Sequence, residues 1–304
     1  MIKVSVVVAV YNHEKYIEQA LYSIMAQKTN FDFEVLIGED CSTDNTRTIL
    51  KNIEKKCPSN FQFFYRDENY GSEKNFNDLY ERMQGEYFIV LEGDDYWTYE
   101  YKLQKQFDFL EKHKDYIACS HNVQVVNDKS EVVQMDYQEC KDSEYTIEHF
   151  RCGLLPGQTA SLFIRNYYKN NLIDYSLQKI PFLAGDMRKA FMLVLQGKIY
   201  CIQEKWSCYR FVQNSGSSFS ATHKKNIKNL ENALNFYFEM IKFAKKLHNS
   251  QGILAAEELY FLTLASKIKI EKEKDDLKIF IKRFFCCKNK RYIVKYILKK
   301  GDIK

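Results

Sequence analysis

No run of apolar residues in this chain approaches the roughly 18 that a membrane-spanning helix needs, so the sequence predicts no membrane span. The beginning of the chain, Met1 to Val4, enters an apolar strand pattern directly and lacks the layout of a signal peptide. The nine cysteines are odd in number, and none are paired at the spacing of metal ligands. We therefore expect reduced thiols and a cytoplasmic protein.

Two kinds of glycine-rich phosphate loop are also missing. No Gly-x-Gly-x-x-Gly follows the first predicted strand, which disfavours a dinucleotide site, and no Gly-x-x-x-x-Gly-Lys-Ser/Thr occurs in the chain. If the protein binds phosphates, we expect a metal ion to hold them, because Mg²⁺ or Mn²⁺ binds carboxylate oxygens together with substrate phosphates.

The sequence does contain a regular alternation of strand and helix patterns. Apolar, β-branched runs, typical of parallel strands buried on both faces, alternate with segments whose apolar residues have helical spacing. The predicted strands are 4–10, 33–38, 61–65 and 86–91, and helical patterns lie between them at 17–25, 49–53 and 73–83. Four strands joined by three helices predict an α/β fold with a doubly wound, mostly parallel sheet.

Two local predictions concern the edges of these elements. Asn12 is a good N-cap residue, so we expect it to cap the first helix. Residues 116–126 and 131–135 alternate in polarity around a polar turn, which predicts an antiparallel pair of strands beside the parallel sheet.

The charge changes sign along the chain and indicates where a second region begins. Residues 223–304 contain 20 Lys or Arg and 9 Asp or Glu, a net charge of +11, and have helical spacing throughout. We therefore predict a catalytic domain over 1–222 and a basic α-helical region over 223–304. Such a region suits an anionic membrane surface or lipid phosphate, or it is simply a solvated helical face. No nucleic-acid partner is expected, because no recognised binding motif is present.

The most informative stretch is Val90-Leu91-Glu92-Gly93-Asp94-Asp95, where three acids follow a buried strand. Adjacent buried carboxylates are costly, and a hard divalent cation relieves that cost. Asp40 and Tyr11 follow two other strands and are expected at the same sheet edge, where α/β proteins bind ligands. The stretch is either a metal–diphosphate site or an acidic surface turn in which Asp94 or Asp95 caps a helix.

A further acid, Asp186, stands at the start of an apolar helical pattern. Taken alone it is either an N-cap or a carboxylate general base, and composition favours the cap.

At this point the order of motifs resembles the inverting family 2 glycosyltransferases, which have the GT-A fold. The likeness covers about residues 1 to 220. The motifs that carry it are Val4 to Asn12, Glu39 to Thr46, Gly85 to Tyr87, Leu91 to Trp97 with Lys102-Leu103, Gly185-Asp186, and Glu204 with Tyr209-Arg210.

The resemblance implies a role for each matching position. Ala9, Tyr11 and Asp40 would lie against the base of a nucleotide-sugar, Lys74 would approach the nucleotide, and Glu92 would face the ribose. Asp94, with Asp95 beside it, would hold Mn²⁺ or Mg²⁺ on the diphosphate. Asp186 would be the base that deprotonates the acceptor hydroxyl, a role that the resemblance favours over a simple cap.

Two departures from the family pattern stand out. Glu92 replaces the usual first Asp of the metal motif, and Phe211-Val212-Gln213 follow Tyr209-Arg210 where many relatives have a His.

The resemblance implies a metal-dependent inverting glycosyltransferase, by default with a UDP-sugar donor and a glycan or lipid-linked acceptor, in surface polysaccharide assembly. Such an enzyme would work in the cytoplasm or at the inner face of the cell membrane. The alternatives are a sugar nucleotidyltransferase and a non-catalytic protein that binds nucleotide-sugars.

Overall fold

A computed structural model describes residues 1–180, 185–212, 227–271, 274–287, 290–291 and 294. The chain divides into two compact units, each built from several segments. The first comprises Met1–Thr146, Leu154–Asp174 and Gln196–His223, and the second comprises Ile147–Gly153, Tyr175–Leu195 and Lys224–Lys304.

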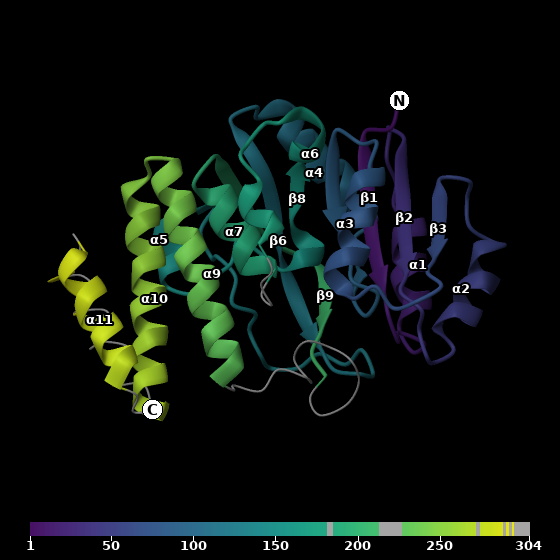
Figure 1. The fold of residues 1–304 in the computed structure, drawn as a ribbon. Helices are drawn as coiled ribbons and strands as arrows, with labels where there is room; N and C mark the ends of the chain where they lie inside the picture. Colours follow the sequence, from purple (N-terminus) through teal and green to yellow (C-terminus); the bar gives the residue numbers. More distant parts are fainter. Residues whose placement is uncertain (181–184, 213–226, 272–273, 288–289, 292–293, 295–304) are drawn as a thin grey trace. The chain divides into compact units, whose positions relative to one another are not determined.

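The first unit is a twisted sheet with helices on both faces (Figure 1). Within the described residues nine strands join in the order β3-β2-β1-β4-β8-β6-β9-β5, with β7 paired to β9. The strands are β1 Val4–Val10, β2 Phe33–Glu39, β3 Phe61–Tyr65, β4 Tyr87–Val90, β5 Tyr96–Trp97, β6 Tyr116–Val126, β7 Glu144–Tyr145, β8 Phe163–Arg165 and β9 Lys198–Arg210. The helices are α1 Ile17–Met25, α2 Thr46–Glu54, α3 Ser72–Arg82, α4 Lys102–Lys112, η1 Thr159–Ser161 and α6 Tyr167–Asn170.

The four N-terminal strands are parallel, as the sequence predicts, and β1 lies between β2 and β4. Beyond β4 the sheet becomes mixed, because β8 runs antiparallel to both β4 and β6, while β6 and β9 are parallel. The expectation of an α/β fold with a mostly parallel sheet is confirmed.

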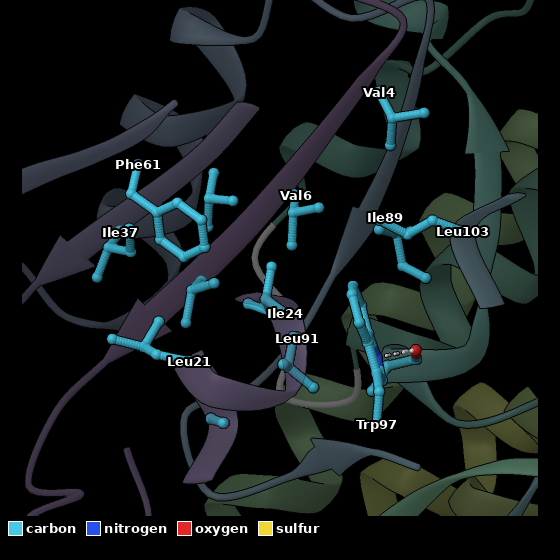
Figure 2. Close-up of a cluster of buried hydrophobic side chains, with 14 of the residues drawn as sticks. Val4, Val6, Leu21, Ile24, Ile37, Phe61, Ile89, Leu91, Trp97 and Leu103 are labelled. Atoms are coloured by element: carbon cyan, nitrogen blue, oxygen red, sulfur yellow. Dashed lines mark hydrogen bonds between the residues drawn. The ribbon is translucent and has the colours of Figure 1, made fainter. Parts of the chain in front are cut away.

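The main core lies on one face of β1, where alternate residues point toward the same helices. Val4 and Val6 of β1, Leu21 and Ile24 of α1, and Leu103 of α4 are fully buried together, and Figure 2 shows them converging around the strand. Helix α3 packs on the opposite face, where Tyr80 meets Phe88 edge to face. Parallel strands with apolar residues on both faces require helices on both sides, which is why the runs in the sequence are continuous.

Two local predictions are wrong, and both concern loop chemistry. Asn12 does not cap α1: its φ is 57°, and its side chain accepts a hydrogen bond from the Thr43 backbone N–H at 2.8 Å instead. Residues 131–135 form no strand, and Val126 and Val132 make only an isolated antiparallel bridge. Asn12 instead serves a loop distant in sequence, whereas the segment after the turn stays beside the end of β6 through backbone hydrogen bonds from Val133 N–H to the Val125 carbonyl and from Asn127 N–H to the Glu131 carbonyl.

The second unit is helical within its described residues. It contains α5 Ile147–Arg151, η2 Ser176–Lys179, α7 Gly185–Val194, α9 Ile227–Lys246, α10 Ser250–Glu271 and α11 Lys274–Cys286. Arg151 of α5 donates to the buried carboxylate of Glu258 on α10, at 2.7 Å from Nη2 and 2.8 Å from Nε. Figure 1 shows α9, α10 and α11 in succession, with α10 packed against both of its neighbours. None of the described helices is both long and apolar enough to traverse a bilayer.

Candidate functional site

The ends of three parallel strands bring the predicted site residues of the first unit to one edge of the sheet. The Asp40 N–H donates to the Val10 carbonyl, and the Leu91 N–H donates to the Val7 carbonyl, both at 2.9 Å. Asp40, Tyr11 and Glu92 therefore leave neighbouring strands at the same edge. This is the place where open α/β sheets bind ligands.

Asp40 and Lys74 belong to one small cluster. Asp40 is buried, and its Oδ1 accepts a hydrogen bond from the Tyr70 N–H at 2.7 Å. The Lys74 Nζ lies 3.7 Å from the centre of the Tyr70 ring, a short cation–π contact. Ala9 is partly exposed although Val8 and Val10 are buried, so β1 opens toward solvent at that residue.

The loops after β1 and β2 each contain one residue with a positive φ. Asn12 and Cys41, each two residues beyond its strand, both have φ 57°, an uncommon conformation for residues other than glycine. The loops also bond to each other, because Asn12 N–H donates to Ser42 Oγ at 3.0 Å and His13 N–H donates to Thr46 Oγ1 at 2.8 Å. Hydrogen bonds between the two loops help to stabilise the uncommon backbone conformation.

The three acids after β4 form what we call the acidic loop, Glu92 to Asp95. Asp95 is 1% exposed, and both of its oxygens accept hydrogen bonds: Oδ2 from Gln158 Nε2 at 2.7 Å and Oδ1 from the Arg210 N–H at 2.8 Å. The same Gln158 Nε2 donates to Glu92 Oε2 at 3.2 Å. Two of the three acids are thus held by one amide group.

Burial, reinforced by the charges of Asp94 and Glu92, raises the pKa of Asp95 well above its ordinary value, although Arg210 opposes the shift. Without a compensating positive charge, ionising all three carboxylates of the acidic loop costs free energy, because they are adjacent and one of them is buried.

Arg210 braces the acidic loop from β9. Its Nε donates to the Asp94 carbonyl at 2.9 Å, and its Nη1 donates to the Asn127 carbonyl at 2.8 Å. Its Nη2 donates to Gln19 Oε1 on α1 at 2.9 Å, and the guanidinium lies 4.3 Å from the centre of the Tyr16 ring. One buried side chain therefore joins the loop to α1 and to the turn after β6.

Asp94 differs from its two neighbours. Its side chain is partly exposed and accepts no hydrogen bond from the residues that the structure describes. An acidic carboxylate without protein donors, next to two others, is what a hard divalent cation binds. The residues present therefore fit Mg²⁺ or Mn²⁺.

His13 lies beneath the acidic loop. Its Nδ1 is buried and has no hydrogen-bond partner among the described residues, and a Cβ added at Gly93 would lie 2.4 Å from that nitrogen. Burial lowers the pKa of His13, although Asp94 and Asp44 oppose the shift. The glycine of the loop is thus required by close packing.

Asp186 belongs to the second unit, so its role stays a prediction. It lies in the first turn of α7, where its Oδ1 accepts from the Met187 N–H at 2.7 Å. Burial raises its pKa, against the effects of hydrogen bonds from Met187 and its own backbone and of Lys189. A raised pKa suits a base that must take up and release a proton near neutral pH.

Sequence reasoning missed Gln158 and His13. Gln158 stands in a loop with no motif, and its only local signal is a polar residue between Gly157 and Thr159. His13 follows the Tyr-Asn motif, but nothing in the sequence relates it to Gly93, 80 residues later. Both contacts depend on the tertiary fold.

Comparison with known proteins agrees with the geometry. A family model described as Glycosyl transferase family 2 matches residues 5–171, more than half of the chain. An uncharacterized protein of Mycobacterium tuberculosis, Rv1520, is 36% identical over 174 residues, 57% of this chain and 47% of that protein. The putative teichuronic acid biosynthesis glycosyltransferase TuaG of Bacillus subtilis is 39% identical over 107 residues, 35% of this chain and 41% of TuaG. The chain spans about half the length of these curated relatives or less.

The crystal structure of Staphylococcus aureus TarS residues 1–349 with UDP-GlcNAc superposes with a TM-score of 0.67. At 19% identity the match covers 92% of this chain and 79% of the TarS chain. The fold is therefore that of a GT-A-like glycosyltransferase domain.

The chain belongs to glycosyl transferase family 2.

Proposed function

We propose that this protein is a metal-dependent inverting glycosyltransferase that moves a sugar from a nucleotide-sugar to an acceptor hydroxyl. The observation that carries the proposal is the acidic loop of a family 2 chain, in which the Asp94 carboxylate accepts no hydrogen bond from the described residues while Glu92 and Asp95 do. UDP-sugar is the donor we expect by default, which the solved complex of the similar protein TarS with UDP-GlcNAc supports.

The residues at this edge of the sheet would each contact a different part of the nucleotide-sugar. Asp40 is held by the Tyr70 N–H through Oδ1, and its Oδ2, which accepts no hydrogen bond from the described residues, would accept an N–H of the base. Tyr11 and Ala9 would line the base, Lys74 would approach the nucleotide, and Glu92 would face the ribose.

Asp94 would hold Mn²⁺ or Mg²⁺, a cation that offsets the charge developing on the leaving diphosphate. The acceptor hydroxyl is a poor nucleophile, so Asp186 would take its proton from a distance of about 3 Å. A single displacement inverts the anomeric centre, and the chain needs no nucleophile of its own.

The acceptor class we propose is a glycan or lipid-linked acceptor in surface polysaccharide biosynthesis. The support comes from the names of similar proteins, TuaG and a teichoic acid poly(glycerol phosphate) polymerase of Staphylococcus epidermidis, which is 36% identical over 95 residues.

The test is release of nucleoside diphosphate from a panel of nucleotide-sugars with Mn²⁺. We expect slow hydrolysis without acceptor, lost in Asp94→Ala. Asp186→Asn should retain donor affinity but lose transfer to an acceptor. Release of pyrophosphate would indicate a nucleotidyltransferase, and binding of donor without turnover would indicate a scaffold.

We further propose that α11 contacts an anionic membrane surface. Ile281 and Phe285, 46% and 69% exposed, lie four residues apart on one face of α11, and exposed Lys282 lies three residues before Phe285. Exposed Lys290 and Arg291 follow. Apolar side chains beside lysines suit the headgroup region of anionic lipid.

Vesicle sedimentation tests the membrane contact. We expect binding to vesicles with anionic lipid but not to neutral ones, and a loss in Ile281→Ser/Phe285→Ser. Val132→Ser is the matched control, since Val132 is 67% exposed and lies in the other unit. Equal binding by both variants, or concentration-dependent dimers that the double substitution removes, would refute the contact.

A further inference from the structure

Gln158 is an amide group placed among carboxylates. Its side chain is 2% exposed, and its Oε1 accepts from the Ala160 N–H at 2.6 Å, which determines the orientation of the amide. The Nε2 must then face Asp95 and Glu92, and its two hydrogens match the two acceptors at 2.7 and 3.2 Å. A carboxylate or an apolar side chain at this position could not donate either bond.

The hydrogen bonds divide the three acids into two kinds. Asp95 uses both oxygens on protein donors, Gln158 Nε2 and the Arg210 N–H. Glu92 is held by the same Nε2. Asp94, between them, is anchored through its backbone carbonyl by Arg210 Nε, while its carboxylate has no donor within the described part of the chain.

We propose that Gln158 is a positioning residue that ties Glu92 and Asp95 to the protein, so that Asp94 presents its carboxylate to the cation of the donor. The inference rests on the proposed function. It gives Asp95 a supporting role, in place of the metal-ligand role that the motif implies.

Gln158 contacts both Glu92 and Asp95, so a substitution at this one position tests the proposal. If Gln158 were merely filling space, an isosteric side chain would replace it without consequence. Gln158→Glu has the same shape and can still accept from the Ala160 N–H, but it replaces two donated bonds with repulsion between carboxylates.

The experiment measures how much Mn²⁺ strengthens the binding of UDP, by calorimetry on the full chain with and without the metal. We expect Gln158→Glu to reduce that strengthening by about tenfold or more, the value of one hydrogen bond to a charged group. Its affinity for UDP without metal should fall by less than its affinity with metal, because Asp40 and Tyr70 are untouched and only the ribose contact that we assign to Glu92 is weakened. Equal losses with and without metal, no loss, or tighter metal-dependent binding would overturn the proposal.

A double variant that exchanges the side-chain types of Gln158 and Asp95 tests whether Asp95 supports the loop or binds the metal. In Gln158→Glu/Asp95→Asn the amide and the carboxylate exchange places, so one bond between them and the total charge are restored. We expect the double variant to recover most of the metal-dependent strengthening. A double variant that stays as weak as Gln158→Glu would overturn the supporting role that we assign to Asp95.

Thermal unfolding without metal shows whether each variant folds, and the double variant keeps the test meaningful if Gln158→Glu does not. Wild-type protein that binds neither UDP nor any other nucleoside diphosphate would refute the proposed function itself. Wild-type binding with an unaffected Gln158→Glu would refute only the role of Gln158.

Discussion

Gly93, in the middle of the acidic loop, has no room for a side chain, and Gly93→Ala tests that directly. The added methyl would lie 2.4 Å from His13 Nδ1 and 3.2 Å from Ile17 Cδ1. Favourable contacts between such atoms lie near 3.5 Å, so the ring or the loop must move by about 1 Å. The His13 backbone is held by Thr46 Oγ1 and the ring nitrogen is buried, so relieving the clash requires the ring to repack among its neighbours.

The expected cost in free energy of unfolding is about 1–3 kcal/mol, typical of overpacking a well-packed place. Asp94 is the next residue, and a displacement of about 1 Å can reduce a rate by about 10²-fold. Denaturant unfolding measures the first effect, and release of nucleoside diphosphate measures the second.

Two companion variants make the test sharp. Gly185→Ala is the control for stability, because no described heavy atom lies within 4 Å of its added Cβ. Gly185 is the first residue of α7, where helix propensity counts less than in the interior, so the change in stability should be small. His13→Ala in the Gly93→Ala background removes the clashing ring, and the two changes should cost less together than the sum of their separate costs. Gly93→Ala with wild-type stability and activity would refute the packing argument.

Three further changes probe the supports of the site. Burial lowers the pKa of Lys102 well below its ordinary 10.5, so the unfolded chain binds a proton that the folded chain does not, and stability rises with pH toward 10.5. Lys102→Met should flatten that rise in denaturant unfolding, and an unchanged slope would contradict it. Arg210→Lys should cost about 2–3 kcal/mol, since an ammonium cannot reach both the Asp94 and Asn127 carbonyls, and thermal unfolding with no loss would count against the brace. Trp97→Phe deletes the 3.1 Å hydrogen bond to the Ala160 carbonyl and should cost about 1–3 kcal/mol by the same measurement, whereas a neutral result would mean that water replaces it.

The sequence by itself determined the parallel half of the fold. Short apolar runs rich in β-branched and aromatic residues are typical of strands in a parallel sheet, and the helical patterns between them indicate crossovers, so β1 to β4 were predictable from local patterns. The acids at the carboxyl ends followed from the same logic, because parallel strands end at one edge. Asp40, Tyr11 and Glu92 do lie at that edge.

Only the tertiary structure decided how the acids differ from one another. Nothing near Asp94 or Asp95 in the sequence distinguishes them, because the donors come from Gln158 and Arg210, more than 60 residues away. Asn12 shows the same limit, since its side chain serves a neighbouring loop in place of its own helix. Short-range patterns reflect burial and periodicity, while hydrogen bonds are satisfied by whichever partner the fold brings within about 3 Å.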